Sequence, residues 1–327
     1  MPKRSMILAV VALLLALAPA RAADPITVRV NVFSGVQNLA IFAGQAKGLF
    51  ARHGLTVELQ TTPNSPAQRA GLAEGKFEIA HAGVDNAVAM VELAKVDAVI
   101  VMGGDNSLQE LFVQPGIASI ADLKGKTVIV DAPNTAYALV VKKALMNQGL
   151  AAGRDYTLKP TGGTFQRLGL MRENKEHAAT MLNPPFSVMA ARDGFKSLGL
   201  ATKLVGSYQG TGAFVLRSWA KASGETLERY IGAYVEATRW SMAPANRAEA
   251  AALLADRLKL APDVAAATLE QAVRDGFAPD ARLDMDGFRG TLAVRAATEN
   301  TWNGPAPAPD KYVDLSYYQR AIAALGR

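Results

Sequence analysis

Cysteine is absent from this sequence of 327 residues, and the absence excludes several chemistries at once. Without cysteine the chain has no disulfide framework, no thiolate metal site, no cysteine nucleophile and no lipid attached through an N-terminal cysteine. Charged residues make up only a fifth of the chain, whereas hydrophobic residues make up half of it. That composition excludes disorder as the main state and provides for one large or two medium hydrophobic cores.

Recognisable cofactor-binding and catalytic motifs are also missing from the sequence. Neither of the usual glycine-rich phosphate-binding loops occurs, and there is no Gly-x-Ser-x-Gly nucleophile elbow. The three histidines, His53, His81 and His177, lie far apart and lack metal-ligand spacing. We therefore expect no catalytic residues, no metal site and no cofactor. His81 precedes a predicted ligand loop, so its contact with a ligand stays an open question.

The N-terminus has the pattern of a cleavable signal peptide. Lys3 and Arg4 precede an uncharged run of 16 residues, 5–20, and Ala20-Arg21-Ala22 has the small-x-small spacing of a signal-peptidase site. The run is shorter than the roughly 20 residues that a membrane-spanning helix needs. We expect residues 1–22 to be removed and the mature protein to be soluble in the periplasm, without a lipid anchor.

The net charge of the mature chain gives no reason to expect a nucleic-acid partner. The formal net charge is +6, but three of the 35 basic residues lie in the expected signal peptide, which contains no acidic residue. The remainder has 32 basic and 29 acidic residues, with no basic run that is interleaved with aromatic residues. We expect no nucleic-acid binding.

Strand patterns alternate with helix patterns along most of the chain. Residues 26–33 alternate as a strand does, and helix spacing follows from residue 39. A second series contains a strand over 127–130 and a helix over about 136–147, whereas the chain beyond Tyr208 is mainly alanine-rich helix. Such alternation predicts parallel sheets that are covered by helices on both faces.

Three stretches carry a distinctive order of glycine, charged and hydrophobic residues. They are Ala46-Lys47-Gly48-Leu49-Phe50-Ala51-Arg52-His53-Gly54-Leu55, Leu72-Ala73-Glu74-Gly75-Lys76-Phe77-Glu78-Ile79-Ala80 and Ser119-Ile120-Ala121-Asp122-Leu123-Lys124-Gly125-Lys126-Thr127-Val128. In this order they resemble the NMT1/THI5-like family of exported solute-binding proteins. Members of that family serve ABC importers for sulfonates, nitrate, taurine and thiamin-pyrimidine precursors.

The resemblance implies an α/β architecture, the type II periplasmic-binding-protein fold, with two lobes joined by two crossover segments. Lobe 1 is then discontinuous, comprising residues 23–112 and 211–327, and lobe 2 comprises residues 113–210. We expect the crossings near residues 111–115 and 207–213. The implied partners are a small-molecule ligand and the permease of an ABC importer in the inner membrane, and we expect the protein to be a monomer.

The resemblance further implies capture of a small organic ligand, which is a sulfonate, a carboxylate or a pyrimidine-like compound. Relatives usually have a Glu-Pro pair where this chain has Asn183-Pro184-Pro185, so the ligand of a relative does not transfer directly. The alternative is an exported sensor or enzyme on the same scaffold. A thiamin-pyrimidine synthase is related to the family and uses iron with a cysteine-rich motif, which is absent here.

Candidate binding residues follow from the position of the predicted strands, because ligands of such sheets bind beyond the carboxyl ends of the strands. Asn134 and Thr135 precede a predicted helix, where they can cap its first turn while free N–H groups attract a negative oxygen. Asp85 either caps a helix or accepts a hydrogen bond from an amine, hydroxyl or ring N–H of the ligand.

Uncharged polar side chains suit reversible capture, and aromatic rings suit contact with a planar or apolar ligand body. The predicted ligand-binding residues are Ser34, Gln37, Asn38, Asn64, Asp85, Asn86, Asn106, Asn134, Thr135, Tyr137, Thr164, Asn183, Phe186 and Tyr208.

Overall fold

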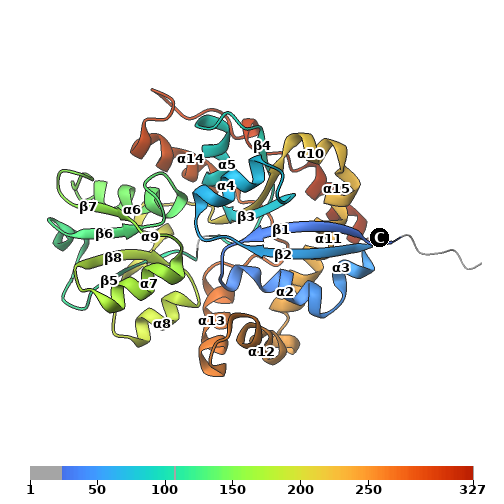
Figure 1. Ribbon diagram of the computed structural model, residues 1–327, viewed down its shortest axis with the longest axis horizontal. Helices are drawn as coiled ribbons and strands as arrows, with labels where there is room; N and C mark the ends of the chain where they lie inside the picture. Colours follow the sequence, from blue (N-terminus) through green and yellow to red (C-terminus); the bar gives the residue numbers. More distant parts are fainter. Residues whose placement is uncertain (1–23, 107, 327) are drawn as a thin grey trace, which may run out of the picture.

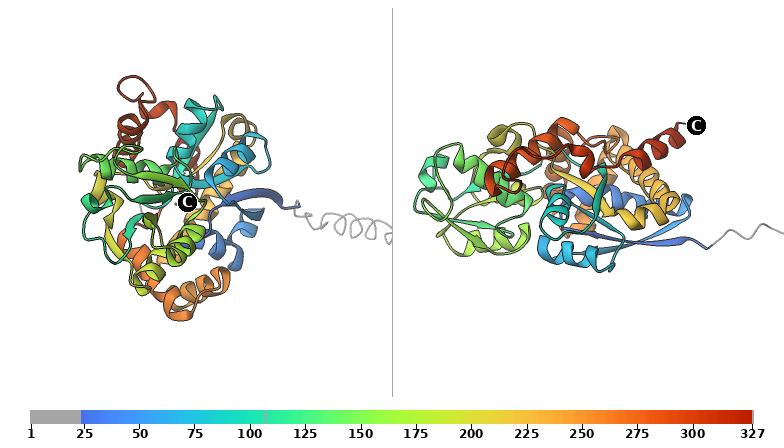
Figure 2. Two further views of the ribbon diagram at one scale, coloured as in Figure 1. Left: turned by 60° about the vertical axis from the view of Figure 1, so that its left-hand side comes forward. Right: turned by 90° about the horizontal axis from the view of Figure 1, so that it is seen from above.

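The computed structural model describes residues 24–106 and 108–326, so the expected signal peptide, residues 1–22, lies outside the described residues. Two α/β lobes lie side by side along the long axis of the molecule (Figures 1 and 2). Each lobe contains one five-stranded sheet. The expected mixed α/β architecture with two lobes is confirmed.

Lobe 1 is built on a sheet with the strand order β2-β1-β3-β10-β4. Its strands are β1 (Ile26–Val32), β2 (Leu55–Thr61), β3 (Ile79–Gly83), β4 (Ala98–Gly103) and β10 (Thr211–Leu216). The alternation in β1 buries Val28, Val30 and Val32 in one hydrophobic cluster. That cluster includes residues of α2 (Leu39–Ala46), α3 (Leu49–Arg52), α10 (Arg217–Ala222), α11 (Gly224–Met242) and α15 (Ser316–Leu325). A second cluster packs α4 (Ser65–Ala73), α5 (Asp85–Glu92) and α14 (Met285–Glu299) on the opposite face.

Lobe 2 repeats this plan with the strand order β7-β6-β8-β5-β9. Its strands are β5 (Glu110–Val113), β6 (Thr127–Val130), β7 (Thr157–Pro160), β8 (His177–Leu182) and β9 (Lys196–Leu200). One hydrophobic cluster joins the sheet to α6 (Ala136–Met146) and α9 (Ala201–Val205). On the other face, Leu168 of α7 (Thr164–Glu173) and Phe186 of α8 (Phe186–Arg192) pack against Phe112. Both faces of each sheet are therefore covered.

The sheets differ from the expected all-parallel arrangement at one strand each. Strand β10 is antiparallel to both β3 and β4, and strand β5 is antiparallel to both β8 and β9. These are the first strands that the chain forms after it passes from one lobe to the other. The expectation of purely parallel sheets is therefore wrong, because each passage reverses the direction in which the chain enters the sheet.

The chain passes between the sheets after β4, where the described residues are 104–106 and 108–109, and again over residues 206–210. The first passage precedes the expected position at residues 111–115, because β5 already belongs to the second sheet. Gly206 has a φ of 87°, a left-handed value that glycine adopts without steric strain, at the start of the second passage.

Helices α13 (Pro262–Asp275) and α14 of the C-terminal half connect the lobes further. The paired helices α12 (Arg247–Leu258) and α13 pack beside α2 and η1 (Val36–Asn38). The hydroxyl of Ser187 in α8 donates a hydrogen bond to Gln271 of α13 over 3.1 Å. Helix α14 packs on both lobes, since Phe288 belongs to a core cluster of lobe 1 and Val294 to that of lobe 2.

The remaining elements are short 3-10 helices in connecting loops. They are η2 (Ile120–Leu123), η3 (Pro244–Asn246) and η4 (Pro309–Lys311). None of the helices within the described ranges has both the length and the apolar character for crossing a membrane.

Candidate functional site: a cavity between the lobes

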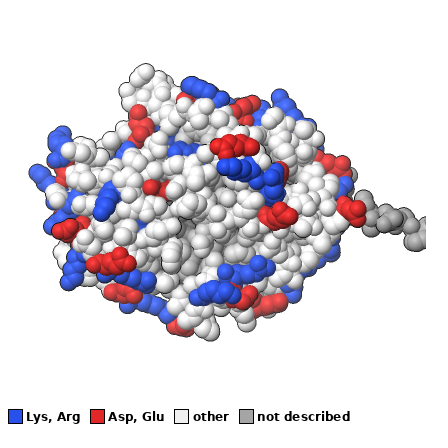
Figure 3. Space-filling view, in the orientation of Figure 1, with Lys and Arg blue, Asp and Glu red and all other residues white. Residues whose placement is uncertain are grey.

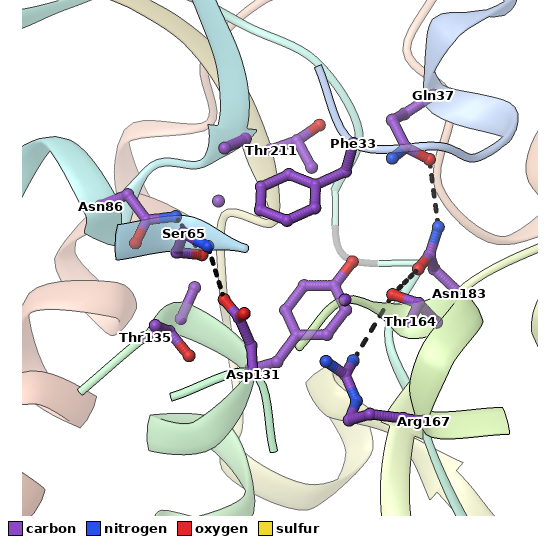
Figure 4. A pocket seen from close by; sticks show the side chains of 15 residues that line it. Phe33, Gln37, Ser65, Asn86, Asp131, Thr135, Thr164, Arg167, Asn183 and Thr211 are labelled. Atoms are coloured by element: carbon purple, nitrogen blue, oxygen red, sulfur yellow. Dashed lines mark hydrogen bonds between the residues drawn. The ribbon is translucent and has the colours of Figure 1, made fainter. Parts of the chain in front are cut away.

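A cavity lies between the two lobes (Figure 4), with about 450 Å³ of space between atoms when the part that is open to solvent is included. Lobe 1 contributes the ends of β1 and β3 and the first turns of α4 and α5, and lobe 2 contributes the end of β6 and the first turns of α6 and α7. The cavity is lined by Phe33, Gln37, Ser65, Ala82, Gly83, Asn86, Asp131, Thr135, Ala136, Tyr137, Gly163, Thr164, Arg167, Asn183 and Thr211. It therefore lies where the carboxyl ends of strands from both sheets converge.

Six of the predicted ligand-binding residues line this cavity: Gln37, Asn86, Thr135, Tyr137, Thr164 and Asn183. Asn183 joins the lobes, since its amide donates to Oε1 of Gln37 over 3.0 Å and its Oδ1 accepts from the Thr164 hydroxyl over 3.1 Å. Side chains from α7, from η1 and from the residue that follows β8 thus meet at one side of the cavity (Figure 4).

The other predicted residues lie outside the cavity lining and have structural contacts of their own. Asn64 caps α4 by accepting from the Ala67 amide over 2.8 Å, and Asn38 donates to the Phe33 carbonyl over 2.6 Å. Tyr208 is buried in the core of lobe 2, and Phe186 packs edge-on against Phe165. The remaining four are Ser34 on a groove outside the cavity, Asn106 on the first passage between lobes, Asn134 beside Arg69, and Asp85.

Asp85 forms a buried ion pair with Arg295 of α14, an arrangement that the sequence analysis did not include. Nε and Nη2 of Arg295 donate to the two carboxylate oxygens over 2.6 and 2.7 Å. Burial disfavours the charged guanidinium, but Asp85 holds the pKa of Arg295 above its ordinary value. Of the two roles expected for Asp85, capping is wrong, because α5 has no side-chain cap. Its paired carboxylate stands outside the cavity lining.

The N-terminus of α6 reaches the cavity without the expected side-chain cap. Thr135 occupies the N-cap position, but its hydroxyl donates to the Ala132 carbonyl over 2.9 Å. Asn134 instead accepts a hydrogen bond from Arg69 over 3.3 Å. The capping expected of this pair is therefore wrong. Because Ala136 and Tyr137 line the cavity, the first turn of α6 presents its positive end there.

Arg167 is a cavity residue that sequence reasoning missed. It is only 1% exposed, and its described hydrogen bonds all go to uncharged oxygens: Thr180, Gly162, Met181 and Thr164. Desolvation lowers the pKa of its guanidinium, and the negative charge of Asp131 opposes that shift. An arginine on a helix normally indicates a solvated face, so the sequence contains no signal for this burial.

Asp131 is the second charged residue in the wall, and it also went unselected among the candidates. The carboxylate is 8% exposed, and its Oδ2 accepts from the backbone N–H of Ser65 over 3.0 Å. The Ser65 hydroxyl in turn accepts from the amide of Asn86 over 3.2 Å. A chain of hydrogen bonds therefore runs from the residue that follows β6 in lobe 2 to α5 of lobe 1. The position of Asp131 directly after a predicted strand was the sequence signal that could have identified it as a cavity residue.

Aromatic rings form the apolar part of the wall. Phe33 and Tyr137 line the cavity, and burial raises the pKa of the Tyr137 hydroxyl, which stays neutral. Phe33 also borders the outer groove, together with Phe165, whose side chain is 68% exposed. Phe33 thus stands between the inner cavity and the outer groove.

His81 does not line the cavity. Its Nε2 lies 2.8 Å from the Tyr230 hydroxyl, and its ring stacks on Tyr234 with centroids 5.0 Å apart. Burial lowers its pKa to about 3, so the ring is neutral at physiological pH. His81 is a core residue of lobe 1.

The lobes touch through their backbones around the cavity. Val36 N–H donates to the Pro184 carbonyl over 3.1 Å, and Gly163 N–H donates to the Pro63 carbonyl over 3.0 Å. Together with the Asp131 and Asn183 bonds, these contacts define a closed arrangement. On the face drawn in Figure 3, charges of both signs are interspersed and the middle is largely uncharged.

Comparison with known protein families assigns the chain to one of them. The sequence profile described as the NMT1-like family matches residues 21–255. No curated protein matches the chain.

Solved structures with very different sequences share the fold. A Bordetella bronchiseptica RB50 protein has a TM-score of 0.81 at 19% identity, covering 93% of this chain and 99% of its own. The periplasmic nitrate-binding protein NrtA from Synechocystis PCC 6803 has a TM-score of 0.77 at 13% identity, covering 92% and 89%. The alkanesulfonate-binding protein SsuA from Xanthomonas axonopodis pv. citri, bound to MOPS, has a TM-score of 0.71 at 18% identity, covering 88% and 96%.

An enzyme also shares this architecture. The desulfurization enzyme DSZB has a TM-score of 0.61 at 15% identity, covering 90% of this chain and 99% of its own. The nitrate-binding and alkanesulfonate-binding neighbours show that the fold is that of periplasmic binding proteins. Because an enzyme shares it, the fold alone does not distinguish binding from catalysis.

Proposed function

Because the chain belongs to the NMT1-like family, we propose that it is an exported solute-binding protein of an ABC importer. It captures a small organic ligand, of the sulfonate, carboxylate or pyrimidine-like class, between its two lobes and delivers it to the permease. The observation that carries this proposal is the cavity at the lobe boundary, whose wall is made by strand ends and helix starts of both sheets. Similarity to nitrate-binding and alkanesulfonate-binding proteins supports it.

Ligand capture and lobe closure are coupled in this proposal. Asp131 and Asn183 each form a hydrogen bond to the opposite lobe while lining the cavity. A ligand that touches both walls therefore stabilises the closed form and shifts the population toward it. The importer recognises the closed form, and the described residues of the two passages, 104–106, 108–109 and 206–210, act as the hinge.

Export to the periplasm as a monomer without a lipid anchor completes the proposal. The signal-peptide pattern over residues 1–22 and the periplasmic nitrate-binding neighbour support that location.

The alternative is an exported sensor or enzyme on the same scaffold, which the similarity to a desulfurization enzyme favours. The described lining residues of the cavity include no histidine, lysine or cysteine. Ser65 and Thr164 are therefore without an imidazole base to activate them as nucleophiles.

A thermal-shift screen of sulfonates, aromatic carboxylates and pyrimidines tests the proposal. A ligand at 100 times its dissociation constant stabilises the native state by about 2.7 kcal/mol and raises the melting temperature. Small-angle scattering should then show smaller dimensions at saturation, and mass spectrometry should recover the ligand unchanged. Absence of any stabilising compound contradicts the receptor function, and turnover of the ligand favours the enzyme.

A further inference from the structure

Two buried acceptor oxygens in the cavity wall have no hydrogen-bond partner among the described residues. They are Oδ1 of Asp131 and Oδ1 of Asn86. Both side chains are more than nine-tenths buried, and both line the cavity. Their other polar atoms are engaged, because Asp131 accepts from the Ser65 amide and Asn86 donates to the Ser65 hydroxyl.

Ser65 lies between these two side chains, so the unpartnered oxygens belong to one local network (Figure 4). Asp131 comes from lobe 2, whereas Asn86 and Ser65 come from lobe 1. A buried acceptor without a donor is destabilising, and for a carboxylate the cost is larger than for an amide. A donor group of the ligand that sits at this network would satisfy these acceptors and engage both lobes.

The rest of the wall has the opposite chemistry. Arg167 is a buried cation without a described carboxylate in hydrogen-bond contact, and α6 and α7 begin at the cavity without side-chain caps. These groups favour an acceptor or an anionic group. The two charged side chains of the described wall, Asp131 and Arg167, are of opposite sign.

We propose that the ligand carries an N–H donor at the Asp131 and Asn86 oxygens and an acceptor or anionic group toward Arg167 and α6. This inference rests on the proposed function and names its substrate class. Amino-substituted sulfonates or carboxylates and amino-substituted nitrogen heterocycles belong to the class. An anion that only accepts hydrogen bonds does not, since it leaves the two oxygens unpaired and meets the negative charge of Asp131.

Titration calorimetry with matched pairs tests this inference. The pairs are taurine with ethanesulfonate, β-alanine with propionate, and 4-aminopyrimidine with pyrimidine, so that each pair differs only in an amino group. For the wild-type protein, we expect the amino member of at least one pair to bind ten or more times more tightly than its partner.

The substitution Asp131→Asn should reverse this preference. An asparagine keeps an oxygen for the Ser65 amide but presents an N–H₂ group, without charge, to the ligand. We expect the amino member to lose at least tenfold in affinity, while the amino-free member of that pair gains. Asp193→Asn is the matched control, because Asp193 pairs with Arg172 in lobe 2 and does not line the cavity. It should bind as the wild type does.

Equal or tighter binding of the amino-free member to the wild type overturns the inference and leaves the receptor function standing. An unchanged preference in Asp131→Asn overturns it also. Failure of all six probes to bind contradicts the donor-bearing class, and the broad thermal-shift screen decides separately whether the protein is a receptor.

Discussion

The buried histidine of lobe 1 makes folding stability depend on pH in a calculable way. His81 is 6% exposed and has a pKa of about 3 in the folded protein, against an ordinary value of 6.5. Between these values the unfolded chain binds a proton that the folded chain does not, so stability falls as pH falls from 6.5 toward 3. At pH 5 the loss relative to pH 8 is about 2 kcal/mol, which is ~1.5 pH units at ~1.36 kcal/mol each.

The substitution His81→Phe isolates this contribution. It keeps a ring against Tyr234 and loses the hydrogen bond to Tyr230, a loss that is the same at both pH values because burial holds the pKa of Tyr230 far above 10. Urea unfolding of both proteins at pH 8 and pH 5 gives the difference in their free energies of unfolding. We expect the wild-type advantage to shrink by about 2 kcal/mol at pH 5. An advantage that is equal at the two pH values refutes the reasoning.

Two further predictions concern contacts between elements that are distant in the chain. Replacing Arg295 with Met leaves the Asp85 carboxylate buried and unpaired, which should lower the free energy of unfolding by roughly 3–5 kcal/mol, whereas the double variant with Asp85→Leu should recover most of it. A double variant as unstable as the single one would contradict this, and urea unfolding measures both. Asn183→Ala removes the hydrogen bond to Gln37 between the lobes, which contributes about 1 kcal/mol to closure. Ligand affinity should therefore fall roughly fivefold, and small-angle scattering should show a larger radius of gyration. The control Asn246→Ala breaks a bond within lobe 1 and should change neither.

Apolar periodicity was sufficient to predict those helices and strands whose own residues carry a clear helix or strand pattern. The strand at Thr127–Val130 and the helix at Ala136–Met146 lie where apolar periodicity predicts them. Strand β5 was taken for a connection, because four residues, Glu110 to Val113, carry no local sign of the sheet they join. Its antiparallel orientation depends on partners that lie about 70 and 90 residues further along the chain.

The positions of the strand ends predicted where the candidate site lies, but they did not predict all of the residues that line it. Gln37, Thr164 and Asn183 follow or adjoin such ends, and the structure brings them together. Arg167 lies on the first turn of a helix, where an exposed and a buried arginine have the same sequence signature. Only the packing of α7 on β8, which supplies Thr180 as an acceptor, removes it from water.

The position of β10 sets an order for acquiring the native structure. This strand lies between β3 and β4 and pairs with both, yet it is the last strand in the chain. During translation, the sheet of lobe 1 therefore cannot be completed until residue 216 has left the ribosome. The sheet of lobe 2, in contrast, is formed by one continuous segment of the chain. The half of the molecule that is translated first is completed last, and until then the apolar edges of β3 and β4 need protection from aggregation.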